Sequence, residues 1–298
     1  MKNRFNIIAV FIAMLFCGMS VNAGTNTGDA SAERLYVKGS KLVNKNGKNV
    51  ILKGVSYGWH NWWPRFYNAS TVRYFAQEWN ANIVRAAMGV EPGDGYLNDK
   101  EKALNCIYSV ADAAIGAGIY VVIDWHCHHM LIEEAKEFFH NTAMRYKGIP
   151  NVIYEIFNEP EKVDWADVKA YSEDVIKTIR SVDPDALILV GTPHWDQHVD
   201  KAADNPIKGY KNIMYTLHFY AKSHKQDIRD KADYAIKKGL PIFVSECAGM
   251  EASGNGPIDY DEWNTWLKWM KKNSISWVAW SVSDKNETCS MLKPEASS

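Results

Sequence analysis

The chain has 298 residues, a length that suits one large domain or two small ones. Its formal net charge at pH 7 is −1, so we expect no electrostatic attraction to nucleic acid or to an anionic membrane. The 12 tryptophans exceed what a core needs, so some are expected in a groove that stacks on flat ligand faces. Trp263, Trp266 and Trp269 recur at helical spacing and are assigned to packing.

The N-terminal residues 1–23 have the pattern of a secretory signal peptide. Lys2 and Arg4 provide a positive start, residues 5–16 are mostly apolar, and residues 21–23 offer small side chains for cleavage. The apolar run is too short to span a bilayer comfortably, which disfavours a retained anchor. We therefore expect a secreted or periplasmic protein that has no membrane association once the signal is removed.

The remainder of the chain is predicted to form a single unit. Residues 24–34 are rich in Gly, Thr, Asn, Asp and Ser and are expected to be a flexible lead-in, followed by one domain over residues 35–298. We expect this domain to act as a monomer. Removing the signal also removes Cys17, and the four remaining cysteines are too few to make a disulfide scaffold, so no required bridge is predicted.

Strand and helix patterns alternate along the chain after a small hairpin around residues 35–43. The hydrophobic runs predict strands at residues 50–55, 82–88, 119–125, 152–157, 186–190, 213–217, 241–244 and 275–280. Amphipathic spacing predicts helices at residues 69–79, 100–117, 131–146, 165–181, 227–238 and 259–273.

Eight strands that alternate with helices are typical of an α/β fold of the (β/α)8 or TIM-barrel type. The strands are continuous Val, Ile and Leu runs, as buried parallel sheets require. An open doubly wound sheet is the alternative, but no glycine-rich phosphate turn follows the first strand. Pro193, Pro206 and Gly209 predict a short or missing helix within residues 190–213. The segment after the eighth strand is short, so the final helix is expected to be missing or truncated.

Polar residues follow the predicted strands at their C-terminal ends, where barrels of this type carry their active sites. Glu159 and Glu246 each terminate an apolar run, and a carboxylate in such a place is costly unless it has a function. A pair of carboxylates that shares a cleft is what cleavage of a glycosidic bond needs. The other polar or aromatic residues at strand ends are Arg85, Asp124, His126, Asn158, His218, Tyr220 and Trp280.

Several of these segments make the chain resemble the endoglucanases of glycoside hydrolase family 5. The resemblance rests on Asn158-Glu159-Pro160 and Ser245-Glu246 in combination, and it extends from about Leu52 to Pro294. It implies a retaining endo-β-1,4-glucanase on a (β/α)8 barrel, which hydrolyses internal bonds of cellulose or related β-glucans through a covalent glycosyl-enzyme. The expected partner is therefore a β-glucan polysaccharide or oligosaccharide.

The resemblance also implies roles for individual residues. Glu159 is the expected general acid/base and Glu246 the nucleophile. Glu246 must stay ionised, helped by Arg85 and the Tyr220 hydroxyl. Glu159 must hold a proton at neutral pH, so its pKa is expected to be raised while the other carboxylate is charged. The further implied contacts are His218 beside Glu159, Asn158 on the sugar 2-hydroxyl, His126 in the same region, Trp280 as a stacking floor, Trp62 as an outer platform, and Lys285 and Glu287 further along the cleft.

Each assignment has a structural alternative. The two glutamates can be members of buried ion pairs, and His126 and His218 can be hydrogen-bonded core histidines. Trp62 can be a packing residue, because Trp59 and Trp63 compete for the same place. Lys285 and Glu287 can be solvated loop charges.

A metal site is a further alternative at the third strand. Alternation there places Asp124, His126 and His128 on one side, which superficially resembles a metal triad. No further ligand cluster is evident in the sequence, and a two-glutamate mechanism needs no metal. We therefore predict neither a metal nor a cofactor.

Two departures from the family pattern affect the sugar-binding walls. Gly58 stands near the place where many relatives carry a histidine, with His60 displaced, and Cys247-Ala248-Gly249 follows the nucleophile where an aromatic-glycine pair is frequent. A β-mannanase or a mixed-linkage β-glucanase therefore remains an alternative, since both share the reacting glutamates. An alternative of another class is a non-catalytic glycan-binding protein.

Overall fold

The computed structural model describes residues 32–91 and 93–296. The predicted signal peptide, Cys17 and most of the predicted lead-in lie outside the described residues, so these remain predictions. The four other cysteines, Cys106, Cys127, Cys247 and Cys289, are free thiols.

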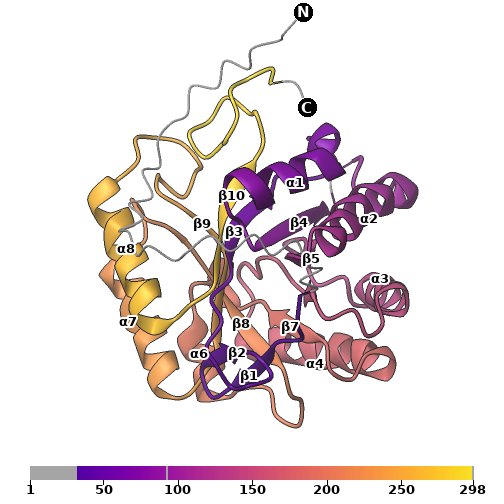
Figure 1. Cartoon of the computed structure of the whole chain (residues 1–298). Coiled ribbons are helices and arrows are strands. Elements are labelled where there is room, and N and C mark those ends of the chain that lie inside the picture. The colour runs from indigo at the N-terminus through magenta and orange to yellow at the C-terminus, as the bar shows by residue number, and fades with distance from the viewer. Residues whose placement is uncertain (1–31, 92, 297–298) are drawn as a thin grey trace, which may run out of the picture. The chain divides into compact units, whose positions relative to one another are not determined.

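Eight parallel strands close into a barrel, which confirms the predicted TIM-barrel fold (Figure 1). The first barrel strand pairs with both the second and the last, so the described sheet has no free edge. In sheet order the strands are β10 (Trp277–Val282), β3 (Lys53–Tyr57), β4 (Ile83–Gly89), β5 (Tyr120–His126), β6 (Val152–Glu155), β7 (Leu187–Val190), β8 (Ile213–Tyr220) and β9 (Ile242–Ala248).

Helices surround the strands, and their ends follow local sequence signals (Figure 1). The Asn68 side chain accepts the backbone N–H groups of Ser70 and Thr71 and so caps the first helix, as predicted. Gly118 and Gly148, with φ of 69° and 78°, follow the second and third helices at points where a left-handed residue ends the helix. The long helices are α1 (Ala69–Glu78), α2 (Lys100–Gly116), α3 (Ile132–Arg145), α4 (Trp165–Val182), α7 (Gln226–Lys237) and α8 (Tyr260–Asn273).

The two irregular regions also agree with the sequence. Between β7 and β8 the chain forms two short helices, α5 (Pro193–Asp196) and α6 (Val199–Asp204), in place of one long helix. After β10 the described chain runs through turns and bends up to residue 296 without a helix. A short 3-10 helix, η1 (Pro64–Phe66), precedes α1.

The core has two main clusters. One fills the space between barrel and helices, and the predicted packing role of three tryptophans of α8 is confirmed there, since Trp263, Trp266 and Trp269 are all buried. Trp266 stacks on Phe219 with ring centroids 3.8 Å apart. None of the helices within the described residues combines the length and hydrophobicity needed to span a bilayer.

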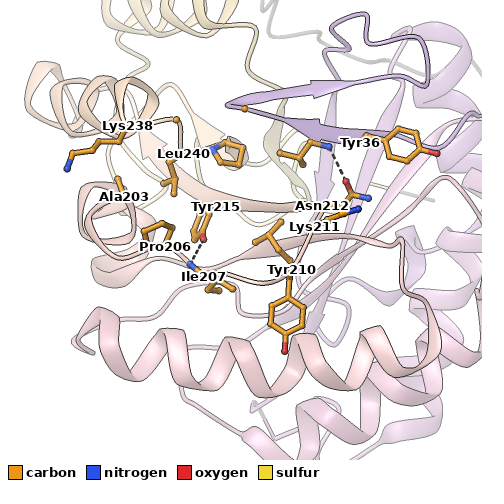
Figure 2. Close-up of a pocket in the computed structure, with 15 residues that line it drawn as sticks. Tyr36, Ala203, Pro206, Ile207, Tyr210, Lys211, Asn212, Tyr215, Lys238 and Leu240 are labelled. Atoms are coloured by element: carbon orange, nitrogen blue, oxygen red, sulfur yellow. Dashed lines mark hydrogen bonds between the residues drawn. The ribbon is translucent and has the colours of Figure 1, made fainter.

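The second cluster fills the N-terminal part of the barrel interior and includes Leu35 and Leu42 of the hairpin. The hairpin strands β1 (Tyr36–Lys38) and β2 (Lys41–Val43) therefore cover the end of the barrel at which the strands begin. A pocket of about 460 Å³ lies beside the hairpin, at the start of β8 and β9 (Figure 2). Its polar groups are partly engaged already, because Asn212 accepts the N–H of Val37.

Candidate active site

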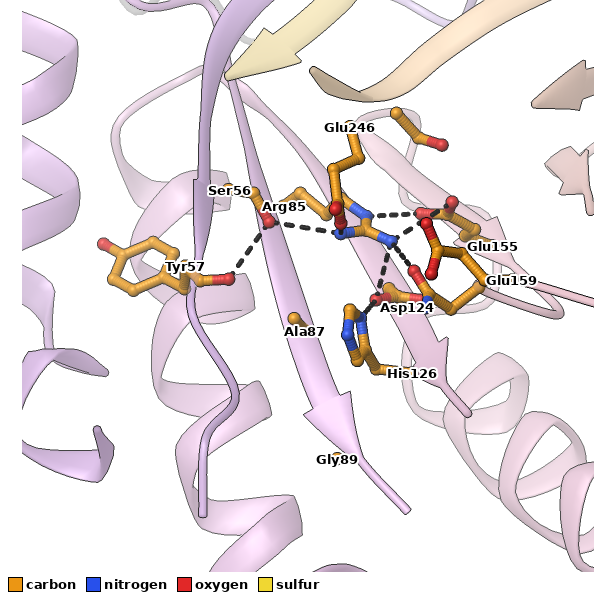
Figure 3. Close-up of polar contacts among 12 residues, drawn as sticks. Ser56, Tyr57, Arg85, Ala87, Gly89, Asp124, His126, Glu155, Glu159 and Glu246 are labelled. Carbon is orange, nitrogen blue, oxygen red and sulfur yellow. Dashed lines mark hydrogen bonds and ion pairs between the residues drawn. The ribbon is translucent and has the colours of Figure 1, made fainter. Parts of the chain in front are cut away.

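Arg85 lies at the centre of a buried charge cluster inside the C-terminal half of the barrel (Figure 3). This residue of β4 has no exposed surface, and its guanidinium meets one carboxylate from each of three other strands. The nitrogen–oxygen distances are 3.0 Å to Asp124 of β5, 2.7 Å to Glu155 of β6 and 3.2 Å to Glu246 of β9. A single cation thus holds three acids that could not otherwise be buried.

Glu246 is held by two donors, one on each carboxylate oxygen. Arg85 Nη1 donates to Oε2 at 3.2 Å, and the Tyr220 hydroxyl donates to Oε1 at 2.7 Å. The residue next to it across the sheet is His218 of β8. This pair of donors fixes the direction of the Glu246 carboxylate, as a nucleophile requires.

Glu159 lies in the loop after β6 and faces Glu246. Its Oε1 is 2.9 Å from His218 Nδ1. A carboxylate oxygen of Glu159, a carboxylate oxygen of Glu246 and a ring nitrogen of His218 all lie within 4.8 Å of one another. The two acids predicted from separate strands therefore do converge on one place, as Figure 3 shows for the two glutamates.

The pKa values of the two glutamates are shifted in opposite directions in the unliganded site. Burial raises the pKa of Glu246, and the charge of Glu159 raises it further, although His218, Arg85 and Tyr220 oppose this. Burial also acts to raise the pKa of Glu159, but the hydrogen bond and charge of His218 outweigh it, and the pKa of Glu159 is lowered. The expected rise of the Glu159 pKa beside a charged Glu246 stays a prediction, and the histidine at hydrogen-bonding distance acts against it.

Asn158 and His126 line the same space. Asn158 Oδ1 accepts from Arg85 Nη2 at 2.6 Å, while its buried Nδ2 has no hydrogen-bond partner among the described residues. That amide is free to donate to a ligand hydroxyl, the role predicted for it. His126 Nδ1 is 2.7 Å from Asp124 Oδ2, and burial and the charge of Arg85 keep the pKa of His126 well below its ordinary value.

Aromatic rings extend this space outward. The Trp280 ring is nearly parallel to the His126 ring, at 7° and with centroids 5.4 Å apart. Trp59 packs its edge on His126, and Trp62 stacks on Trp59 with centroids 4.8 Å apart. Trp62 is 51% exposed, so it presents an open aromatic face rather than a packed one.

Lys285 and Glu287 are brought to each other rather than to the central cluster. They form an ion pair of 2.6 Å in the loop after β10, with the Lys285 side chain 58% exposed and that of Glu287 8% exposed. Their predicted contacts to sugar hydroxyls stay a prediction.

The metal alternative finds little support in the part of the chain that the structure describes. Asp124 is engaged by Arg85 and His126, and His128 does not join them in a group that can ligate one ion. The described residues whose ligand atoms do come close enough are Glu159, His218 and Glu246, which are the candidate catalytic residues themselves.

Sequence analysis missed three residues of the cluster. Glu155 interrupts the apolar strand at residues 152–157, and this was a usable signal for a buried functional acid. Ser245, whose Oγ is 2.8 Å from His218 Nε2, was noted only as part of a motif. Asp196, fully buried and 3.3 Å from the same nitrogen, comes from the irregular β7–β8 segment and carried no sequence signal.

Comparison with known proteins agrees with this geometry. The family described as cellulase (glycosyl hydrolase family 5) matches residues 43–286. The chain belongs to glycosyl hydrolase family 5. An endoglucanase of Clostridium saccharobutylicum is 40% identical to this family 5 chain over 309 aligned residues, which cover 99% of the chain and 68% of the relative.

Solved structures give the same result. A structure from Cytophaga hutchinsonii has 42% identity and a TM-score of 0.87, covering 89% of this chain and 87% of that one. The catalytic domain of Thermobifida fusca endoglucanase Cel5A, solved in complex with cellotetraose, has 32% identity and a TM-score of 0.83, covering 88% of each chain. The predicted family, the glycoside hydrolase class and the endoglucanase assignment are thereby confirmed.

Proposed function

We propose that this family 5 endoglucanase hydrolyses internal β-1,4 bonds of cellulose or related β-glucans with net retention, using Glu246 as nucleophile and Glu159 as general acid/base. One observation carries the proposal: a carboxylate oxygen of Glu159 and a carboxylate oxygen of Glu246 lie within 4.8 Å of each other. Retaining enzymes hold their carboxyl groups ~5–5.5 Å apart, whereas inverting enzymes need ~6.5–9.5 Å to admit a water.

In the first step the residues act on the glycosidic bond from two sides. Glu159 gives its proton to the glycosidic oxygen, Glu246 attacks the anomeric carbon, and the bond between that carbon and the departing sugar breaks. The reaction needs this proton on Glu159 and a charged Glu246, the reverse of the preference in the unliganded site, where the pKa of Glu246 is raised and that of Glu159 is lowered. Arg85 and Tyr220 hold Glu246 in position for attack, and the free Asn158 amide donates to the 2-hydroxyl.

In the second step Glu159, now a carboxylate, takes a proton from water. That water attacks the anomeric carbon, and the ester bond to Glu246 breaks, which restores both side chains. Two displacements at one carbon return the original configuration. Trp280 provides the aromatic face against which the reacting sugar lies, and Trp62 a second one further out.

The stereochemical outcome tests the proposal. Proton NMR of a soluble cello-oligosaccharide should show the β-anomer appearing first, followed by slow mutarotation. An α-anomer appearing first would remove the nucleophilic role of Glu246. Glu246→Gln keeps the shape of the side chain and should abolish hydrolysis. Comparing carboxymethylcellulose with mannan tests the substrate class, and faster hydrolysis of mannan would favour the β-mannanase alternative.

We also propose that the enzyme is exported. The support is the signal-like pattern of residues 1–23, which lie outside the described residues. Expression of the full chain followed by N-terminal sequencing of the extracytoplasmic protein should find cleavage after Ala23. Retention of Met1 on an intracellular product would contradict export.

A further inference from the structure

The short segment α5 brings a buried acid behind the catalytic centre. Three successive residues other than glycine, His194, Trp195 and Asp196, have left-handed φ angles of 61°, 53° and 58°. Such a run is costly and persists only where the surroundings enforce it. The surroundings here are the loop that carries Glu159, because the N–H groups of His194 and Trp195 donate to Glu161 and Pro160 carbonyls, both at 3.0 Å.

The left-handed turn directs the Asp196 carboxylate toward His218. Asp196 has no exposed surface, its Oδ1 accepts the N–H of Thr192, and its Oδ2 lies 3.3 Å from His218 Nε2. Glu155 Oε1 lies 3.8 Å from the same nitrogen, but Glu155 is also paired with Arg85 at 2.7 Å. Among the described residues, the cation that Asp196 meets is therefore the His218 ring.

The hydrogen bonds of His218 are compatible with a proton on each ring nitrogen. With a proton on each ring nitrogen, His218 donates to Glu159 through Nδ1 and to Ser245 through Nε2. The buried Asp196 Oδ2 makes no hydrogen bond in the described structure, so an ionised Asp196 finds its compensating charge in the His218 ring, 3.3 Å away. Burial raises the pKa of Asp196 well above its ordinary value, although the charge of His218 opposes this. Burial acts to lower the pKa of His218, but the interactions with Asp196, Glu155 and Glu159 outweigh it and raise that pKa well above its ordinary value.

We propose that Asp196 is a positioning residue that holds His218 as an imidazolium behind Glu159 and thereby moves the working range of the acid/base to lower pH. The inference rests on the proposed function, because it concerns the histidine that contacts the proposed acid/base Glu159. The charged and titratable groups that face His218 and Glu159 are Arg85, His128, Glu155, Asp196, His224 and Glu246.

Replacing one carboxylate oxygen of Asp196 with an amide nitrogen tests the inference. Asp196→Asn keeps an acceptor for Thr192 and a residue that tolerates left-handed φ, but it removes the negative charge. His218 then loses its extra proton, Glu159 loses a cationic donor, and the alkaline limb of the pH profile of kcat/KM moves to higher pH. Asp200→Asn is the matched control, since Asp200 is a partly buried aspartate four residues further on that faces Lys201. It should leave the limb in place.

The charge of the ring is read independently of activity. In wild-type protein labelled with 15N-histidine, the His218 signals, assigned by their loss in His218→Asn, should show both ring nitrogens protonated at pH 7. In Asp196→Asn one nitrogen should be unprotonated. A neutral His218 in the wild type overturns the inference, even if the variant does not fold. A folded Asp196→Asn whose pH profile of kcat/KM keeps the wild-type alkaline limb also overturns it. Absence of glucanase activity would overturn the proposed function while leaving the NMR result to be decided.

Discussion

Replacing Arg85 with methionine should destabilise the protein in a way that depends on pH. The side chain is fully buried and pairs with Asp124, Glu155 and Glu246 at 2.7 to 3.2 Å, and these acids are almost fully buried too. Removing one partner from a buried ionic group costs about 3–5 kcal/mol, because the remaining charge has no compensation. A typical domain has only about 5–15 kcal/mol of stability, so Arg85→Met should be close to unfolding at pH 7.

The pH dependence identifies the cause. Arg85 acts to lower the pKa of all three acids, so its loss raises that of Glu155 and raises further those of Asp124 and Glu246, which are already raised in the wild type. The extra cost is therefore present above the raised folded-state pKa values, and it disappears as the pH falls until the acids are protonated in both the folded and the unfolded state. Urea unfolding followed by tryptophan fluorescence at pH 7 and pH 4.5 should therefore show a smaller difference between variant and wild type at pH 4.5.

A surface arginine provides the control. Arg145 pairs with Asp112 at 2.7 Å, but the two side chains are 45% and 51% exposed. Arg145→Met should cost less than about 1 kcal/mol at both pH values. An equal loss for Arg85→Met at pH 7 and pH 4.5 would refute the reasoning, since lost packing alone does not depend on proton binding.

Three further predictions concern single side chains. Tyr220→Phe removes the hydrogen bond that orients Glu246, and hydrogen bonds to charged groups are worth about 1.5–3 kcal/mol, so kcat/KM should fall about 10- to 150-fold; a fall below twofold would contradict this. Trp62→Ala should raise KM for cellotetraose about 2- to 12-fold with kcat nearly unchanged, and an unaltered KM would leave Trp62 outside the groove. Burial lowers the pKa of His60 to about 4 in the folded protein. As the pH falls, the unfolded chain therefore binds a proton at this residue before the folded protein does, which destabilises the fold. Between pH 7 and pH 4 the wild type should lose about 3 kcal/mol more than His60→Asn, measured by urea unfolding, and parallel losses would exclude the effect.

The order of the elements could be predicted because it is local information. Hydrophobic periodicity and the helix caps placed each strand and helix to within a few residues, as at Asn68 and Gly118, since both signals act over one or two turns of chain. The two catalytic glutamates were also accessible, because a carboxylate at the end of an apolar strand is costly wherever that strand packs.

The sequence by itself therefore determined the barrel, the family and the two glutamates that are the candidate reacting acids. Only the tertiary structure showed which charged side chains surround these two glutamates. Arg85 gathers acids from three other strands, and Asp196 reaches His218 from a left-handed turn that leaves no periodic pattern. The pKa of a buried group depends on charges a few ångströms away in space, which lie up to 161 positions apart in the chain for Arg85 and Glu246.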